Sequence, residues 1–266
     1  MLLLLAACSG GAPEKAPAEG NAARQASHPA PPPAMPKPVA RKAQPQALSS
    51  KTASFDFSYK WPGEAAAIPE LDTWLRANGE TLRDHGAARA ASDKAQAKKD
   101  GYPFNGHSYD EDYVVVADTP RMLVLLSDGY VFTGGAHGMP INTAIIWDKA
   151  AKQRLALSQL VDVPRLAALA KKRFCRELDK QRAEKRGGPV NPNDPDTLTE
   201  FVQCVDMTKQ LILPVSADGM AFDALRVVIG PYEAGPYAEG SYVIDLPMDK
   251  GLMAAVKPDY RGAFEG

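Results

Sequence analysis

A glycine-rich turn between two apolar runs is the feature that most limits how this chain can fold. The turn, residues 133–138, reads Thr-Gly-Gly-Ala-His-Gly; one apolar run precedes it at residues 122–126 and another follows at residues 141–147. Its three glycines give the backbone a conformational freedom that residues with a Cβ atom lack. We therefore predict a strand on each side of the turn and a reversal of the chain within it.

Size and charge limit the domain count and the class of partner. The chain has 266 residues, of which 45% are hydrophobic, and this suffices for one folded domain with a sizeable core. The formal net charge of -1 and the isoelectric point of about 6.4 give the protein no overall basic field. We therefore expect no nucleic-acid partner.

The N-terminus has the pattern of an export signal. Residues 1–8 read Met-Leu-Leu-Leu-Leu-Ala-Ala-Cys, an apolar run that ends in small residues before a cysteine. Such a run is typical of a secretory signal and its cleavage site. Residues 5–8 also resemble the lipobox of bacterial lipoproteins, which implies that Cys8 is acylated and anchors the protein on the periplasm-facing surface of a bacterial membrane. The alternative is a short apolar N-terminus with an incidental cysteine.

The next segment differs sharply in composition from the rest of the chain. Residues 9–52 are rich in Pro, Ala and short polar residues, and residues 31–33 are three consecutive prolines. A segment of this kind buries too little apolar surface to offset the entropy of ordering, so we predict a disordered tether. The folded domain is then expected to span residues 53–266.

Two cysteines, Cys175 and Cys204, lie within the expected domain. Exported proteins fold in oxidising compartments, so an even number of cysteines predicts a disulfide between them. The bond would close a loop of roughly 30 residues and stabilise the fold by about 3–4 kcal/mol in the chain-entropy model. The alternative is two free thiols, either buried or too far apart to bond.

The pattern of apolar residues predicts an α+β fold, in which an antiparallel β-meander packs against two or three helices. Strands are expected where β-branched and aromatic residues alternate or cluster, and helices where apolar residues recur at helical spacing. The expected strands are residues 55–59, 113–117, 121–126, 130–133, 141–147, 154–157, 211–215, 224–229 and 241–246. The expected helices are residues 71–99, 164–186, a shorter one from residue 197 and a final one at residues 247–255.

Local signals refine these expectations. Asp128-Gly129 is expected to be a hairpin turn or a bulge, and Thr197 with Glu200 is a capping-box pattern that predicts a helix start. A basic stripe on residues 164–186, which includes Arg182, is expected to face water. The residues after the final helix are expected to form a loose tail.

Two segments together resemble a known family. Residues 130–138 are similar to the Tyr-x-x-Thr-Gly-Gly-Ala-His-Gly signature of a family of bacterial envelope domains, and residues 231–240 resemble its late Pro-Tyr-Glu-x-x-Pro-Tyr-Ala-x-Gly segment. Members include the extracellular part of the anti-sigma-V factor RsiV, which senses lysozyme, and a domain that precedes the catalytic domain of some peptidoglycan deacetylases. The resemblance extends from about residue 55 to the C-terminus and implies an α+β domain.

The lipobox-like N-terminus, the tether and the family resemblance together lead us to expect a lipid-anchored, non-enzymatic protein whose domain binds peptidoglycan or a muramidase such as lysozyme. Tyrosines in a Gly- and Pro-rich loop are good contact residues, so the late segment is expected to contribute to binding. Alternatives are an uncharacterised periplasmic hydrolase that uses the histidine of the turn, and a structural envelope lipoprotein without a small ligand. The candidate binding or motif residues are Thr133, Gly134, Gly135, His137, Gly138, Tyr232 and Tyr237.

The sequence offers little support for catalysis. His137 could act as a general base near neutral pH, but no acid or nucleophile partner is evident, and the acidic run at residues 110–112 is expected to be a solvated edge. The four histidines show no paired spacing for zinc, and the sequence has no Gly-x-Ser-x-Gly elbow and no Walker loop. We therefore predict no catalytic residues, no cofactor and no metal, and expect backbone groups of the turn to satisfy the nitrogens of His137.

Overall fold

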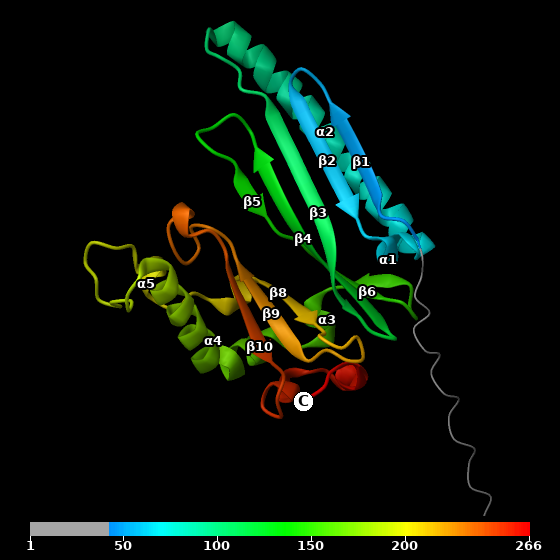
Figure 1. The fold of residues 1–266 in the computed structure, drawn as a ribbon, viewed down its shortest axis with the longest axis vertical. Coiled ribbons are helices and arrows are strands. Elements are labelled where there is room, and N and C mark those ends of the chain that lie inside the picture. The colour runs from blue at the N-terminus through cyan, green and yellow to red at the C-terminus, as the bar shows by residue number, and fades with distance from the viewer. Residues whose placement is uncertain (1–42) are drawn as a thin grey trace, which may run out of the picture. The chain divides into compact units, whose positions relative to one another are not determined.

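The structure is a computed structural model that describes residues 43–266 (Figure 1). The predicted signal sequence, the predicted acylation of Cys8 and residues 9–42 of the predicted tether lie outside the described residues. The described residues have the predicted α+β fold, with one seven-stranded sheet and one three-stranded sheet. None of their helices has the length and apolar character needed to cross a bilayer.

The larger sheet has the strand order β1-β2-β3-β4-β6-β7, with β5 paired to β4 alone. Its neighbours are antiparallel, as predicted for a meander, except that β2 and β3 are parallel. The two strands are parallel because the long helix between them returns the chain to the end of the sheet at which β2 began, so that β3 runs in the same direction as β2. The strands are β1 (Gln46–Lys51), β2 (Phe55–Trp61), β3 (His107–Asp118), β4 (Met122–Phe132), β5 (Met139–Ile141), β6 (Ala144–Asp148) and β7 (Gln153–Leu155).

The sheet begins earlier than predicted. β1 pairs with β2 from Gln46 opposite Trp61 to Lys51 opposite Asp56, so residues 46–51 belong to the sheet and the predicted tether boundary at residue 52 is wrong. Composition concealed this strand because it lies at the sheet edge and its faces are at most half-buried. Leu48, its one large apolar residue, packs against the core beneath α2.

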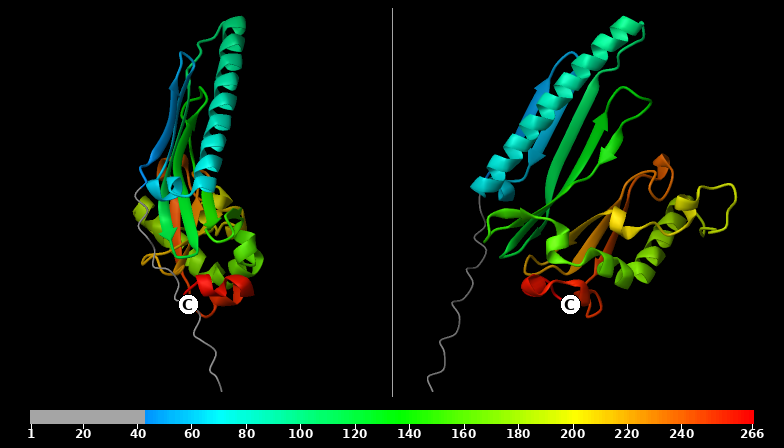
Figure 2. Two further views of the ribbon diagram at one scale, coloured as in Figure 1. Left: turned by 90° about the vertical axis from the view of Figure 1, so that its right-hand side faces the viewer. Right: turned by 180° about the vertical axis from the view of Figure 1, so that it is seen from behind.

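The helix α2 (Pro69–Asp100) covers one face of the larger sheet, after the single turn α1 (Gly63–Ala66) (Figure 2). Phe57 and Tyr59 of β2 are buried against this helix. Gly79 and Gly86 do not interrupt it, because they lie where the helix crosses aromatic rings of β2. A Cβ atom at Gly79 would come within 2.7 Å of the Tyr59 ring, and one at Gly86 would overlap the Phe55 ring.

The smaller sheet is antiparallel with the order β10-β9-β8, and α4 (Val163–Arg186) packs against β10 (Figure 1). The predicted buried face of α4 is confirmed: Leu166, Ala170, Phe174 and Leu178 are buried. The strands are β8 (Leu211–Val215), β9 (Ala224–Ile229) and β10 (Tyr242–Pro247). The shorter helices are α3 (Leu157–Leu160), α5 (Thr199–Val202), η1 (Met207–Lys209), η2 (Tyr237–Glu239), η3 (Leu252–Ala255) and η4 (Pro258–Ala263).

Several strands differ in extent from the predictions, and two of the differences concern β4 and the segment that follows it. Asp128-Gly129 is neither a hairpin turn nor a bulge, because β4 runs through it, and the irregularity lies on β3 between Val115 and Ala117. The predicted strand at residues 141–147 is divided into β5 and β6. It divides because the Asn142 side chain donates a hydrogen bond to the backbone oxygen of Ser127, and such side-chain bonds replace the regular ladder there.

Two further predictions near the C-terminus are wrong. Thr197 and Glu200 do not form a capping box, since α5 begins after Leu198 without a side-chain cap and the Thr197 hydroxyl donates to Asp194 instead. The tail is not loose: Phe264 is buried and its ring packs edge-on against Phe222 at a centroid distance of 5.1 Å. Ala263 and Phe264 thereby belong to the core beneath the smaller sheet.

Candidate functional site

The histidine turn, residues 133–138, connects β4 to β5 at one end of the larger sheet. The Asn105 side chain donates a hydrogen bond to the Gly134 oxygen at 3.3 Å, and the Gly138 nitrogen donates to Tyr130 Oη at 2.8 Å. Gly134 has a φ angle of +90°, in the left-handed region that favours glycine. These contacts fix both ends of the turn and leave the His137 side chain exposed.

The tyrosine loop, residues 230–240, connects β9 to β10 and meets the histidine turn. Tyr237 Oη donates a hydrogen bond to the Gly138 oxygen at 3.0 Å, across 99 residues of sequence. The rings of His137 and Tyr237 stack with their centroids 4.0 Å apart. Tyr232 Oη lies 3.4 Å from His137 Nε2. The two segments that carry the family resemblance are therefore brought together from different sheets.

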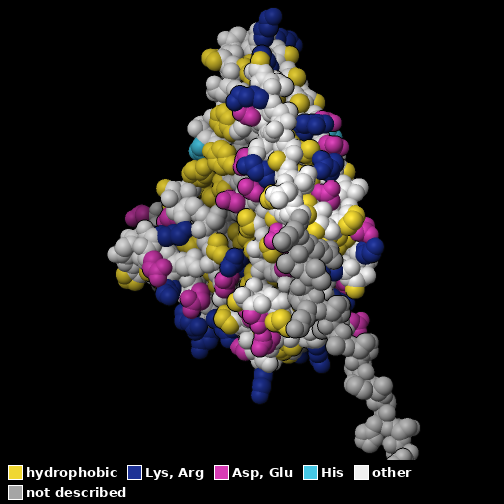
Figure 3. Space-filling view, turned by 45° about the vertical axis from the view of Figure 1, so that its right-hand side comes forward, with side chains coloured by type: hydrophobic (Ala, Val, Ile, Leu, Met, Phe, Trp, Pro, Cys, Tyr) yellow, Lys and Arg dark blue, Asp and Glu magenta, His cyan; other side chains and the backbone are white. Residues whose placement is uncertain are grey.

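We call Tyr130, His137, Tyr232 and Tyr237 the aromatic cluster. Tyr130 is 40% exposed and Tyr232 is 48% exposed, so the cluster has open ring faces although its members touch one another. Figure 3 shows hydrophobic side chains grouped beside a histidine on the molecular surface. Exposed aromatic rings with polar tips combine a stacking face with a hydrogen-bonding group.

The hydrogen bonds of His137 define its tautomer. Nδ1 lies 2.9 Å from the Gly138 oxygen, and because a carbonyl oxygen can only accept, we assign the ring proton to Nδ1. This contact agrees with the expectation that backbone groups of the turn satisfy the ring nitrogens of His137, but it does so only for Nδ1. Nε2 of the neutral ring is then an acceptor that faces Tyr232.

Tyr237 is a neutral hydrogen-bond donor, whereas Tyr130 Oη accepts from the Gly138 nitrogen. The neighbouring phenol of Tyr130 raises the pKa of Tyr237 above its ordinary value of 10.0, so Tyr237 keeps its proton at physiological pH. Tyr232 has a φ angle of +69°, and the left-handed conformation costs a residue with a Cβ atom about 1–2 kcal/mol. Surrounding contacts must therefore hold the tyrosine loop in place.

One of these contacts comes from Arg182 of α4, which is fully buried. Its Nε donates to the Ala234 oxygen at 2.9 Å, its Nη1 to the Gln203 oxygen at 2.9 Å and its Nη2 to the Glu200 oxygen at 2.7 Å. Burial lowers the pKa of Arg182, and Asp179, 3.1 Å from Nη1, opposes this shift. The prediction that Arg182 faces water is wrong because three backbone oxygens and a carboxylate replace the water around its guanidinium group.

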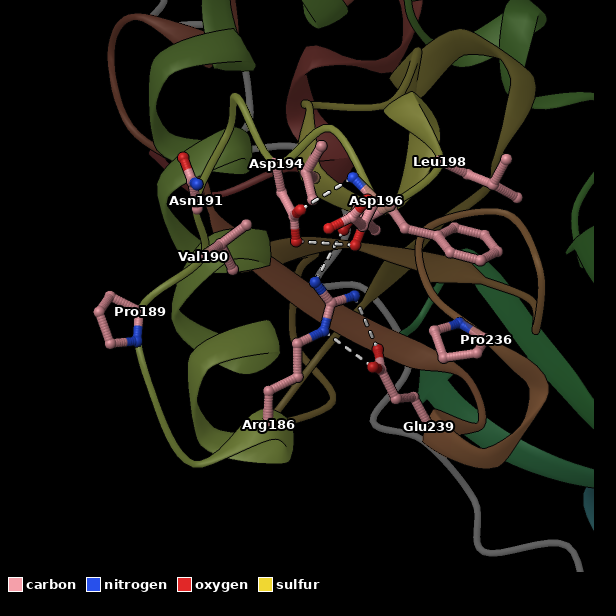
Figure 4. A pocket seen from close by; sticks show the side chains of 12 residues that line it. Arg186, Pro189, Val190, Asn191, Asp194, Asp196, Leu198, Pro236 and Glu239 are labelled. Atoms are coloured by element: carbon pink, nitrogen blue, oxygen red, sulfur yellow. Dashed lines mark hydrogen bonds and ion pairs between the residues drawn. The ribbon is translucent and has the colours of Figure 1, made fainter.

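A second contact comes from Arg186, one turn further along α4. Its Nε and Nη2 donate to the two carboxylate oxygens of Glu239 at 2.8 and 3.0 Å, and its Nη1 donates to the Phe201 oxygen at 2.9 Å. Figure 4 shows this pair on the wall of a pocket of about 490 Å³, which Pro236 also lines. Burial acts to raise the pKa of Glu239, but Arg186 and Tyr242 outweigh it, and the pKa lies below its usual value.

The predicted disulfide is present between Cys175 of α4 and Cys204. It links α4 to the segment that follows α5, because α5 ends at Val202. We call residues 199–205 the disulfide segment. This segment supplies the Glu200, Phe201 and Gln203 oxygens that Arg182 and Arg186 bind.

The acidic run at residues 110–112 is not the solvated edge that was predicted. Asp110 is exposed, but Glu111 is only 1% exposed. Tyr109 Oη and Thr143 Oγ1 donate to its two carboxylate oxygens at 2.7 and 2.8 Å. The alternation of side chains along β3 turns Glu111 into the core beneath α2, where it is far from the solvent that a catalytic acid would share with a substrate.

The candidate residues thus fall into those that contact one another and those that do not. His137, Gly138, Tyr232 and Tyr237 contact one another, whereas Thr133 makes no side-chain hydrogen bond to any residue that the structure describes. Sequence reasoning missed Tyr130 as a site residue, although it begins the first signature. It also missed Arg182, for which no local signal exists, because basic residues at neighbouring helix positions are exposed.

The chemical content of the cluster suits binding. Within residues 43–266, His137 forms no hydrogen bond or ion pair with a carboxylate, and no group of three or more His, Cys, Asp or Glu side chains is arranged to hold a metal ion. The cluster offers open ring faces, phenol donors and one imidazole acceptor. These groups can stack on and hydrogen-bond to a ligand.

Comparisons with known proteins agree with the fold and with part of the resemblance. A family model described as deacetylase PdaC matches residues 48–140, from β1 to β5. No curated protein matches the chain. The family match agrees with the deacetylase-associated part of the resemblance, and the similarity to RsiV stays a prediction.

Two solved structures share the fold. One is a DUF3298 family protein from Pseudomonas aeruginosa PAO1, with 19% sequence identity and a TM-score of 0.51, over 84% of this chain and 97% of that one. The other is a DUF3298 family member from Bacteroides fragilis NCTC 9343, with 13% identity, the same TM-score and the same shares of both chains. At these identities the matches show a common fold.

Proposed function

We propose that this protein is a lipid-anchored, non-enzymatic binding protein of the bacterial cell envelope, and that the aromatic cluster contacts its ligand. The observation that carries the proposal is the convergence of Tyr232 and Tyr237 on His137, from loops of two different sheets. Loops on a rigid sheet commonly carry binding residues. Open tyrosine faces suit either the apolar face of a sugar or a side chain of a protein partner.

The named ligands are peptidoglycan and a muramidase such as lysozyme. The signal-like residues 1–8 support a place in the envelope, and the match of residues 48–140 to a model described as deacetylase PdaC is consistent with the resemblance to the domain found in some peptidoglycan deacetylases. The resemblance of the two signatures to the RsiV family supports the muramidase. Anchoring through Cys8 would keep the domain close to either ligand.

We expect Tyr232→Ala to reduce retention on the ligand about tenfold or more, since a central exposed aromatic contact dominates many binding surfaces. The measurement is a pull-down of the purified protein with insoluble peptidoglycan and, separately, with immobilised lysozyme. Tyr102→Ala is the matched control, because Tyr102 is 53% exposed but follows α2 and lies outside the cluster. Equal retention of the two variants would place binding elsewhere, and no retention of the wild type would exclude both ligands.

One observation favours the hydrolase alternative. The Gly138 oxygen fixes Nδ1–H of His137, and Nε2 faces a tyrosine hydroxyl, as an oriented base would. We expect the wild type and His137→Ala to release equally little acetate and equally few reducing ends from peptidoglycan. Product formed by the wild type and lost in a folded His137→Ala protein would establish the hydrolase. A melting temperature unchanged by either ligand, together with no retention, would favour the structural lipoprotein.

A further inference from the structure

We propose that the Cys175–Cys204 disulfide regulates the aromatic cluster: its reduction releases the tyrosine loop from the histidine turn. The proposal rests on the proposed function of the cluster as a binding surface and concerns the control of that surface. The coupling runs through Arg182 and Arg186, which bind both the disulfide segment and the tyrosine loop.

The disulfide is accessible to a reductant. Cys204 is exposed, and a pocket of about 440 Å³ lies beside it, lined also by Phe174 and Lys171. Lys171 forms no ion pair with any residue that the structure describes, so its ammonium group is available to attract an incoming thiolate. Disulfides that solvent can reach are the ones that thiol exchange reduces most readily.

The reaction is a two-electron exchange with a dithiol reductant. A thiolate of the dithiol attacks Cys204 Sγ, the bond to Cys175 breaks, and Cys175 leaves as a thiolate that takes up a proton. The second thiol of the reductant then attacks the mixed disulfide and releases Cys204 as a thiolate, which is protonated in turn. The protein gains two electrons and two protons, and the dithiol becomes a disulfide.

The first consequence concerns the disulfide segment. Its helix α5 has four residues, which is too short to persist without tertiary contacts. The disulfide joins this segment covalently to α4 next to Gln203, whose oxygen accepts from Arg182. Reduction removes this link and allows the oxygens of Glu200 and Gln203 to leave the guanidinium group.

The second consequence concerns the guanidinium group itself. Arg182 is fully buried, and a buried cation that loses acceptors is costly until water or movement compensates it. Its remaining backbone partner is Ala234, in the middle of the tyrosine loop. Water that enters to solvate Arg182 competes for its hydrogen bond to the Ala234 oxygen. Arg186, which also binds Glu239 of the tyrosine loop, loses its second acceptor, the Phe201 oxygen.

The third consequence concerns Tyr232. Its left-handed conformation persists while the loop is held on both sides, by Ala234 toward α4 and by Tyr237 toward the histidine turn. When the α4 side is released, the backbone can relax and the tyrosines move away from His137. Oxidation restores the contacts, so the binding surface is assembled in the disulfide form.

The test uses the imidazole NMR signal of His137 in the full-length protein, because the Tyr237 ring that stacks on it shifts this signal. Tyr237→Ala gives the position of the signal without the stacked ring. We expect reduction with dithiothreitol to move the His137 signal toward that position and to lower retention on peptidoglycan about tenfold. The buried His107, at the start of β3, reports whether the rest of the fold is intact.

Two variants complete the experiment. Cys175→Ser/Cys204→Ser should show the reduced position of the His137 signal and no response to dithiothreitol. Arg186→Ala, with the disulfide intact, should move the signal in the same direction. An unchanged His137 signal after complete reduction, or loss of the His107 signal through global unfolding, would overturn the proposal. A His137 signal that moves while neither form is retained would support the coupling and refute the proposed peptidoglycan binding.

Discussion

Arg182→Ala is expected to lower the free energy of unfolding by about 3–5 kcal/mol, because buried acceptors left without a donor and the cavity left by a large side chain are both costly. The substitution leaves the oxygens of Ala234, Gln203 and Glu200 without their shared donor. It also leaves a cavity beneath the tyrosine loop, because the Arg182 side chain has no exposed surface. Denaturant unfolding followed by circular dichroism measures the change.

The matched control is Arg176→Ala on the same helix. Arg176 is exposed and forms an ion pair with Glu177 at 3.6 Å, so its loss should change the stability by about 0.5 kcal/mol or less. The large difference is expected because Arg182 is buried and binds three backbone oxygens, whereas Arg176 is exposed. Similar effects of the two substitutions would mean that Arg182 is solvated in solution.

Gly138→Ala is the second large effect expected, with about 1–3 kcal/mol of destabilisation from overpacking and disruption of the aromatic cluster. A Cβ atom at this position would lie 2.5 Å from atoms of the Tyr130 ring and 2.5 Å from the Val131 oxygen. The ring could rotate away, but the backbone oxygen belongs to β4 and cannot move without breaking the strand pairing. The Gly138 oxygen, which Tyr237 and His137 share, would be displaced.

Gly135→Ala tests the same turn without the clash. The nearest atom to a Cβ at Gly135 is the His137 oxygen at 3.8 Å, an ordinary contact distance. We expect this variant to keep its stability within about 0.5 kcal/mol and to keep the His137 NMR signal of the wild type. Thermal unfolding of Gly138→Ala and Gly135→Ala measures the difference in stability. Equal melting temperatures would show that the turn accommodates a methyl group at either position.

Much of the fold could be predicted because many of its elements have strong local patterns. The predictions for residues 211–215 and 224–229 coincide with β8 and β9, two apolar runs separated by turn residues. The long helix over residues 71–99 was found despite Gly79 and Gly86, since leucines at helical spacing mark its buried face. The spacing of apolar residues predicts a helix or strand correctly where one face of the element is apolar and the other is exposed to solvent.

The rest depends on tertiary contacts that leave no local pattern. β1 is polar because an edge strand needs only one half-buried face, so composition assigned it to the tether. Arg182 has the same sequence context as exposed basic residues of α4, and only the oxygens of distant segments make its burial favourable. The candidate site was predicted as two separate segments, and their meeting across 99 residues follows from how two sheets pack.

The origin of the aromatic cluster in two sheets has a thermodynamic consequence. A ligand that covers both His137 and Tyr232 binds only molecules in which the histidine turn and the tyrosine loop are in contact. Linkage is reciprocal: by whatever factor this contact strengthens ligand binding, ligand binding strengthens the contact. The gain in ligand affinity that the contact provides, and the gain in stability of the contact that the ligand provides, therefore equal the same coupling free energy.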